Sequence, residues 1–138
     1  MFWKDINKES RVLTDKLKLL SFKISAAESC TGGLLSSAIV NNSGASETFE
    51  RSFITYSNEA KINILKINDN IIEEFGAVSK QTAYHMALSL IKNFSADVGI
   101  GITGIAGPNG GSKNKPVGLV WIGFGTKNKI TTKKILIK

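Results

Sequence analysis

A serine at the start of a glycine-rich loop is the residue in this sequence best suited to covalent chemistry. Ser29 lies in segment 28–33 (ESCTGG), which follows a short apolar run and leads into a helical pattern. A helix N-terminus presents free N–H groups, and glycine lets the backbone approach an anion closely. The segment is therefore typical of a phosphate cradle or of an oxyanion hole beside a nucleophile. A tight turn without a ligand is the alternative, because neither the P-loop spacing nor GxGxxG is present.

A serine nucleophile needs a base, and segment 56–61 (YSNEAK) offers one. If a helix begins near Asn58, Lys61 lies in its first turn, where the helix dipole lowers the pKa of an ammonium. Burial would lower that pKa further. We therefore expect Lys61 to accept the Ser29 proton and Tyr56 to relay the proton or to orient the pair. A solvated lysine and a packed tyrosine are the alternative.

A second glycine-rich segment, 103–111 (TGIAGPNGG), also follows an apolar run. It could wrap a phosphate or a ribose, with Lys113 or Lys115 adding charge, or it could be a mobile surface loop. Cys30 is a rival nucleophile beside the same helix start. We rank it below Ser29, because a small buried cysteine is the commoner case.

Alternating helices and strands are expected to position these loops. Predicted helices cover residues 5–20, 34–40, 58–65, 70–75 and 80–94, and predicted strands cover 22–27, 49–56, 97–103, 117–125 and 129–137. This order indicates one α/β domain over residues 1–138, a three-layer α/β/α arrangement with a mostly parallel or mixed sheet. Ligands of such sheets bind beyond the carboxyl ends of the strands, where both loops fall.

The helix predicted over residues 80–94 has the clearest periodicity, with Ser79 as its N-cap. Its apolar positions recur at i, i+3, i+4 and i+7. His85 falls with Gln81 and Ser89 on the opposite, polar face. We therefore interpret His85 as an exposed helical histidine and not as the base for Ser29.

Composition excludes several classes of protein. One cysteine and one histidine in 138 residues exclude a disulfide framework, a cysteine-rich zinc module and a histidine-rich metal site. The sequence has no run of about 18 apolar residues, so it predicts no membrane-spanning helix. The N-terminal sequence lacks the apolar region of a secretory signal, so we expect a cytoplasmic location. The net charge is +7, but only Arg11 and Arg51 are arginines. Because nucleic-acid-binding proteins usually contact bases and phosphates through arginine, this composition argues against nucleic-acid binding.

Five ordered motifs carry a resemblance to a known family. They are segments 27–34 (AESCTGGL), 56–61 (YSNEAK), 76–79 (GAVS), 102–108 (ITGIAGP) and 115–120 (KPVGLV). Together they resemble the C-terminal domain of the competence/damage-inducible protein CinA. Members of this family are nicotinamide-nucleotide amidohydrolases, which convert nicotinamide mononucleotide to nicotinate mononucleotide and ammonia in pyridine-nucleotide salvage. The resemblance implies an α/β/α domain, a Ser–Lys mechanism, no metal and no cofactor.

The resemblance also implies roles for particular residues. It points to Ser29 as nucleophile, Lys61 as its base and Tyr56 as helper. The positions that it assigns to binding the pyridine-nucleotide substrate are Thr31, Gly32, Gly33, Thr103, Gly104, Gly107, Gly110 and Gly111.

Two departures from the family pattern bear on function. We expect this protein to lack the domain that precedes this one in larger members, and to lack the basic segment and closing helix that follow the last strand, because the sequence ends at Lys138. We expect apolar surface at that position, which another subunit of a homo-oligomer would cover. A catalytically impaired nucleotide-binding module is therefore the first alternative to an active amidase. A DNA-associated competence accessory protein, suggested by the +7 charge, is the second.

Overall fold

Five helices and five strands alternate along the chain in the computed structural model, which describes residues 2–138. The helices are Phe2–Leu20 (α1), Leu34–Val40 (α2), Asn58–Asn63 (α3), Asp69–Phe75 (α4) and Lys80–Phe94 (α5), with a 3₁₀ turn at Ala45–Glu47 (η1). The strands are Ile24–Glu28 (β1), Phe49–Ile54 (β2), Val98–Gly104 (β3), Leu119–Thr126 (β4) and Lys129–Leu136 (β5). Each predicted element is present, with its ends shifted by a few residues.

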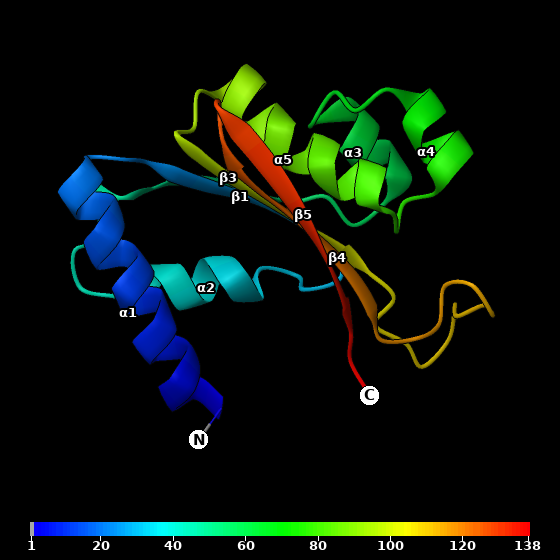
Figure 1. The fold of residues 1–138 in the computed structure, drawn as a ribbon, viewed down its shortest axis with the longest axis horizontal. Helices are drawn as coiled ribbons and strands as arrows, with labels where there is room; N and C mark the ends of the chain where they lie inside the picture. Colours follow the sequence, from blue (N-terminus) through cyan, green and yellow to red (C-terminus); the bar gives the residue numbers. More distant parts are fainter. Residues whose placement is uncertain (1) are drawn as a thin grey trace.

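The strands form one mixed sheet in the order β2-β1-β3-β4-β5. Strand β1 is parallel to β2 and β3, whereas β4 is antiparallel to β3 and β5. Helices α1 and α2 cover one face, and α3, α4 and α5 lie on the other (Figure 1). The predicted three-layer α/β/α fold is thereby confirmed. Within residues 2–138, no helix combines the length and the apolar character that a membrane crossing requires.

Helix α5 supplies much of the core on its face of the sheet. Met86 and Leu90 are fully buried there with Leu65, as the apolar periodicity predicts. The prediction that Ser89 lies on a polar face is wrong. Ser89 is buried, and its hydroxyl donates to the carbonyl of Leu65, so this polar side chain joins α5 to the loop between α3 and α4. His85 is half-buried and packs edge-to-face on Tyr84.

Glycine at position 101 permits the close approach of α5 to β3. A Cβ atom at Gly101 would lie 2.5 Å from the Met86 Cβ and 2.9 Å from the Ala83 carbonyl oxygen. Since the backbone of α5 cannot move away without disturbing the core, we expect Gly101→Ala to lower the free energy of unfolding by about 1–3 kcal/mol. Urea denaturation measures this loss. Ser37→Ala at an exposed position is the control, and equal stability of the two variants would contradict the packing argument.

Apolar side chains remain exposed on the β4–β5 hairpin. Because Gly123 abuts α5, its neighbour Phe124 points to the opposite face of the sheet, where it is 40% exposed. Leu136 and Ile137 at the end of β5 are 54% and 62% exposed. These side chains form exposed apolar surface on the hairpin, and its coverage by a second subunit stays a prediction.

Candidate active site

The end of β1 sends two successive side chains to opposite faces of the sheet. Alternation along the strand directs Glu28 toward α2 and Ser29 toward α3. The chain then turns sharply, with Gly32 and Gly33 both at positive φ (58° and 104°), before α2 begins. Two consecutive residues in the left-handed region require glycine, because a Cβ atom is disfavoured there. The predicted strand–loop–helix unit around Ser29 is therefore present.

Lys61 and Ser29 are in direct contact. The Lys61 Nζ lies 2.9 Å from the Ser29 Oγ, 2.8 Å from the carbonyl oxygen of Thr55 and 3.2 Å from that of Tyr56. Lys61 is 1% exposed and Ser29 is 6% exposed, so solvent scarcely reaches the contact. No salt bridge to Lys61 occurs in the part of the chain that the structure describes.

The low exposure of Lys61 perturbs its ionisation. Burial lowers the pKa of the Lys61 ammonium from 10.5 to about 8, and the neighbouring Cys30 acts weakly in the opposite sense. The expected contribution of the helix dipole is not found. Helix α3 has only six residues, capped by the Ser57 hydroxyl on the Ala60 N–H, and Lys61 lies in its last turn.

The hydrogen bonds around Lys61 suit a neutral amine that acts as a base. A neutral amine carries two N–H bonds and one lone pair. The carbonyl oxygens of Thr55 and Tyr56 can accept the two N–H bonds, which directs the lone pair at the Ser29 hydroxyl. The ammonium form of Lys61 donates to all three oxygens, that of Ser29 included. Once the amine is neutral, its lone pair can accept from the Ser29 hydroxyl, and the amine is then oriented to take the serine proton.

Tyr56 contributes its backbone to this cluster. Its carbonyl oxygen accepts from Lys61 and lies 3.5 Å from the Ser29 Oγ, whereas its side chain is 68% exposed. The phenol makes no hydrogen bond within residues 2–138. A phenol that relays a proton or orients the pair stays a prediction, and in this structure the orienting group at this position is the carbonyl.

Glu28 is a buried carboxylate that sequence reasoning about the site did not single out. It is completely buried, and it accepts hydrogen bonds from the N–H groups of Leu35 (2.9 Å) and Ser36 (3.0 Å) and from the Ser36 hydroxyl (2.5 Å). Burial alone would raise the pKa of Glu28, but these hydrogen bonds outweigh burial and lower it. The signal available in the sequence was a glutamate at the end of a short, mostly apolar strand.

The carboxylate of Glu28 changes the interpretation of the α2 N-terminus. Its hydrogen bonds occupy the N–H groups of Leu35 and Ser36, which a bound anion would otherwise use. The N–H groups of Cys30, Thr31 and Gly33 are different, because within residues 2–138 they donate to no oxygen acceptor. The loop amides, and not the first turn of α2, are therefore the candidates for an oxyanion hole, although those of Cys30 and Thr31 also lie against the Cys30 thiol.

The predicted substrate-binding residues of this first loop differ in accessibility. Gly32 is exposed and Gly33 is half-buried, and a Cβ atom at Gly33 would lie 3.2 Å from the Ile54 Cδ1. The hydroxyl of Thr31 is buried, near enough to Glu28 to lower the pKa of that carboxyl, but it makes no well-formed hydrogen bond.

The second glycine-rich loop follows β3 and begins beside the first. The backbone N–H of Ser29 donates to the carbonyl of Ile102, and a Cβ at Gly104 would lie 2.9 Å from the Cys30 Sγ. Thr103 is 1% exposed, and its hydroxyl donates to the carbonyl of Ala77. The Thr103 hydroxyl is thus engaged in holding segment 76–79.

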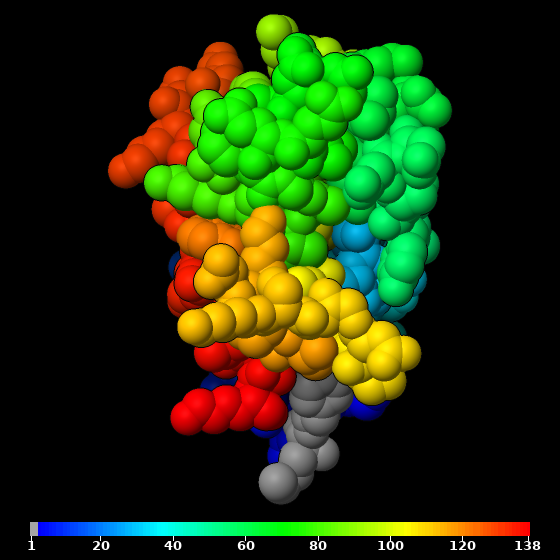
Figure 2. All heavy atoms as spheres, turned by 90° about the vertical axis from the view of Figure 1, so that its right-hand side faces the viewer, coloured from blue at the N-terminus to red at the C-terminus, as the bar shows by residue number. Residues whose placement is uncertain are grey.

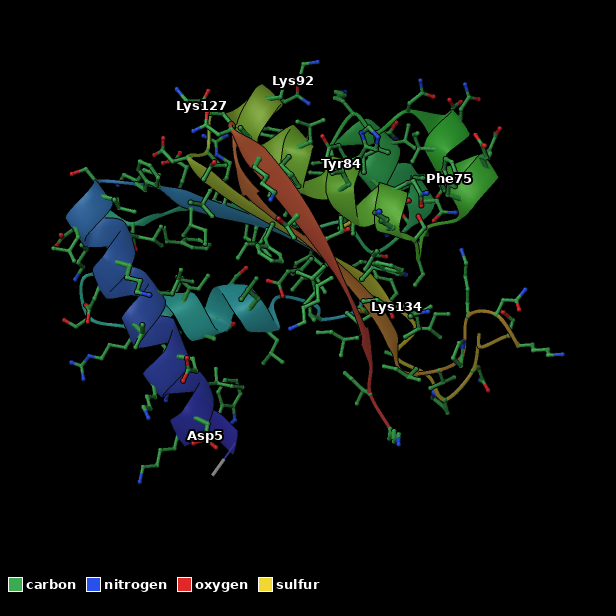
Figure 3. All side chains as sticks on the ribbon, viewed as in Figure 1. Asp5, Phe75, Tyr84, Lys92, Lys127 and Lys134 are labelled. Carbon is green, nitrogen blue, oxygen red and sulfur yellow. The ribbon has the colours of Figure 1, made fainter. Side chains whose placement is uncertain are left out.

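The remainder of that loop spreads over the surface in yellow and orange, on the face where α4 also lies (Figure 2). Of its glycines, Gly110 and Gly111 are exposed and Gly107 is half-buried. The ammonium of Lys115 donates to the carbonyl of Phe75 at the end of α4 (2.6 Å), so one of the two lysines expected to add charge at a ligand is instead bound to the protein. Phe75 is labelled on α4 in Figure 3.

Cys30 is poorly suited to act as the nucleophile. Burial raises the pKa of its thiol, although the amides of Cys30 and Thr31 and the charge of Lys61 act in the opposite direction. A thiol is nucleophilic as its thiolate, which a raised pKa makes scarce. Within residues 2–138, no group of three or more histidine, cysteine, aspartate or glutamate side chains is arranged to hold a metal ion.

Comparison with protein families and curated proteins agrees with the motifs. The model of the CinA C-terminal domain matches residues 6–138. A protein of Caldicellulosiruptor bescii named "Putative competence-damage inducible protein" is 50% identical over 119 residues, covering 86% of this chain and 28% of that protein. The "Nicotinamide-nucleotide amidohydrolase PncC" of Enterobacter agglomerans is 47% identical over 112 residues, covering 81% of this chain and 68% of that protein. The chain spans about a third or less of several of the competence-damage relatives that it matches.

Solved structures of similar proteins share the fold. The competence/damage inducible protein CihA from Agrobacterium tumefaciens has a TM-score of 0.94 at 38% identity, covering 97% of this chain and 82% of that chain. A CinA superfamily protein from Escherichia coli has a TM-score of 0.92 at 33% identity, covering 96% and 77%. With a family match over nearly its whole length and this fold, the chain belongs to the CinA C-terminal domain family.

Proposed function

We propose that this protein is an amidohydrolase that converts nicotinamide mononucleotide to nicotinate mononucleotide and ammonia. The observation that carries the proposal is the buried contact of 2.9 Å between the Lys61 Nζ and the Ser29 Oγ, with the pKa of Lys61 lowered to about 8. At pH 7 such a lysine is neutral roughly 300 times more often than one with a pKa of 10.5. The name of the Enterobacter agglomerans relative supports the choice of substrate.

The first half of the reaction forms an acyl-enzyme. The Ser29 Oγ attacks the carboxamide carbon of the substrate while the Lys61 lone pair takes the hydroxyl proton. Negative charge develops on the carboxamide oxygen, and N–H groups of the first loop, which donate to no oxygen within residues 2–138, stabilise it. A well-placed donor of this kind contributes roughly 3–4 kcal/mol. The C–N bond then breaks, and Lys61 returns the proton to the leaving nitrogen, which departs as ammonia.

The second half regenerates the enzyme. Water enters the position that ammonia has left, and Lys61, neutral again, takes a proton from it. The resulting hydroxide attacks the acyl carbon, and the ester bond to Ser29 breaks. The serine oxygen recovers its proton from Lys61. The product acid gives its remaining proton to the solvent and leaves as a carboxylate. The reaction thus needs one water and no metal or cofactor.

Ammonia release from nicotinamide mononucleotide tests the proposal directly. Because Lys61 must be neutral to act as a base, we expect kcat/KM to rise about tenfold per pH unit below about pH 8 and to level off above it. A coupled ammonia assay from pH 6 to pH 9.5 measures this profile. Nucleotide binding without ammonia release at any pH would instead favour the catalytically impaired module.

A further inference from the structure

Glu28 connects three elements around the loop that carries Ser29. Its carboxylate at the end of β1 binds the first turn of α2 through the amides of Leu35 and Ser36. The Ser36 hydroxyl also lies 2.6 Å from the Ser52 hydroxyl of β2. Strand β1, helix α2 and strand β2 are therefore joined through one buried carboxylate.

The nucleophile loop lies between the two ends of this connection. Residues 29–33 leave β1 directly after Glu28 and reach α2 just before its two amide contacts. Ser29 is the immediate neighbour of Glu28, so a rotation of the backbone at residue 28 moves the Ser29 Oγ relative to the Lys61 Nζ. The Ser29 N–H bond to Ile102 holds the loop from the other side.

Charge and burial indicate that this connection is more than general packing. An ionised carboxylate with 0% exposure is costly unless its acceptor sites are filled, and here three donors fill them. Within residues 2–138 no lysine or arginine forms a salt bridge with it. Its hydrogen bonds also occupy the N–H groups of Leu35 and Ser36 in α2, whereas those of Cys30, Thr31 and Gly33 donate to no oxygen within residues 2–138.

We propose that Glu28 is a positioning residue: its buried carboxylate, bound to the start of α2, holds loop 29–33 so that the Ser29 Oγ meets Lys61 and the loop amides face the developing oxyanion. This inference rests on the proposed amidase function, in which Ser29 is the nucleophile. Glu28 itself touches neither the substrate nor Lys61 in this assignment. A displacement of about 1 Å in the attacking atom is enough to lower turnover by roughly 100-fold.

Glu28→Gln keeps the shape of the side chain and tests the assignment. A glutamine has one acceptor oxygen, and its NH₂ group would face an N–H donor of α2, so the loop should shift. We expect kcat to fall by about 100-fold, with KM within about twofold of wild type and an unchanged pH midpoint near 8, because Lys61 is untouched. Glu28→Asp, which keeps the charge on a shorter side chain, should recover part of kcat.

Ser36→Ala is the matched control. It removes the hydroxyl donor but keeps both amide bonds to Glu28, so we expect a smaller loss of kcat than in Glu28→Gln. Urea denaturation gives the folded fraction of each variant. A wild-type kcat in Glu28→Gln would overturn the proposal, as would a raised KM with unchanged kcat. The proposal would also be overturned if Glu28→Gln had the wild-type rate per folded molecule, because Glu28 would then contribute to folding stability only.

A fluorophosphonate probe separates this inference from the choice of substrate. The Ser29 oxygen forms a bond to phosphorus, fluoride leaves and Lys61 takes the proton, so labelling needs no nucleotide. If wild type labels at Ser29 but releases no ammonia from the mononucleotide, the proposed function fails, and slower labelling of Glu28→Gln still supports the positioning role. Equal labelling rates would contradict it. If Ser29 in wild type does not label, both proposals fall together.

Discussion

Ser29→Ala is expected to lower turnover of nicotinamide mononucleotide by on the order of 10⁴-fold or more, because the variant has no atom to carry the acyl group. The fold should tolerate the change. The Lys61 Nζ keeps the carbonyl oxygens of Thr55 and Tyr56 as partners, so the lost hydrogen bond should cost about 1 kcal/mol of unfolding free energy or less. Ammonia release measures turnover, and calorimetry shows whether the variant still binds the nucleotide.

Two alanine variants serve as controls for that result. Ser37→Ala removes an exposed hydroxyl from α2 and should turn over at the wild-type rate. Cys30→Ala removes the neighbouring thiol and should retain most activity, because burial raises the pKa of Cys30. An inactive Cys30→Ala beside an active Ser29→Ala would show that the thiol is the nucleophile.

Lys61→Met is expected to abolish turnover and to change how stability depends on pH. Methionine fills a similar space without a charge. In wild type the folded pKa of about 8 lies below the unfolded value near 10.5, so between these pH values the unfolded chain binds more protons and stability rises with pH. Wild type should therefore gain roughly 3 kcal/mol of unfolding free energy relative to Lys61→Met from pH 8 to pH 10.5.

Urea denaturation of both proteins at pH 7, 8, 9 and 10 measures that difference. Below about pH 8 both states of wild type carry the proton, so the difference should be constant there. Lys92→Met is the control, because Lys92 is exposed on α5 and points into solvent in Figure 3. If the difference in unfolding free energy between wild type and Lys61→Met were the same at every pH, Lys61 would titrate as an ordinary lysine.

Local patterns in the chain predicted the elements well, because their causes are local. The periodicity of residues 80–94 and the cap at Ser79 define α5, and the Ser79 hydroxyl does accept the Thr82 N–H. Ser89 was assigned to a polar face by the same periodicity. Its burial follows from the loop before α4, whose Leu65 carbonyl needs a donor. Such a contact joins residues distant in sequence, and helical spacing carries no information about it.

The sequence alone determined that a serine follows an apolar strand in a glycine-rich loop, and that a lysine and a tyrosine lie near the start of a later helix. The tertiary structure decided what these residues can do. It buried the Lys61 amine against Ser29, gave the orienting role to the Tyr56 carbonyl and filled the α2 N-terminus with Glu28. The physical reason is that removal from water and directed hydrogen bonds set reactivity, and both depend on how β1, β2 and α3 pack together.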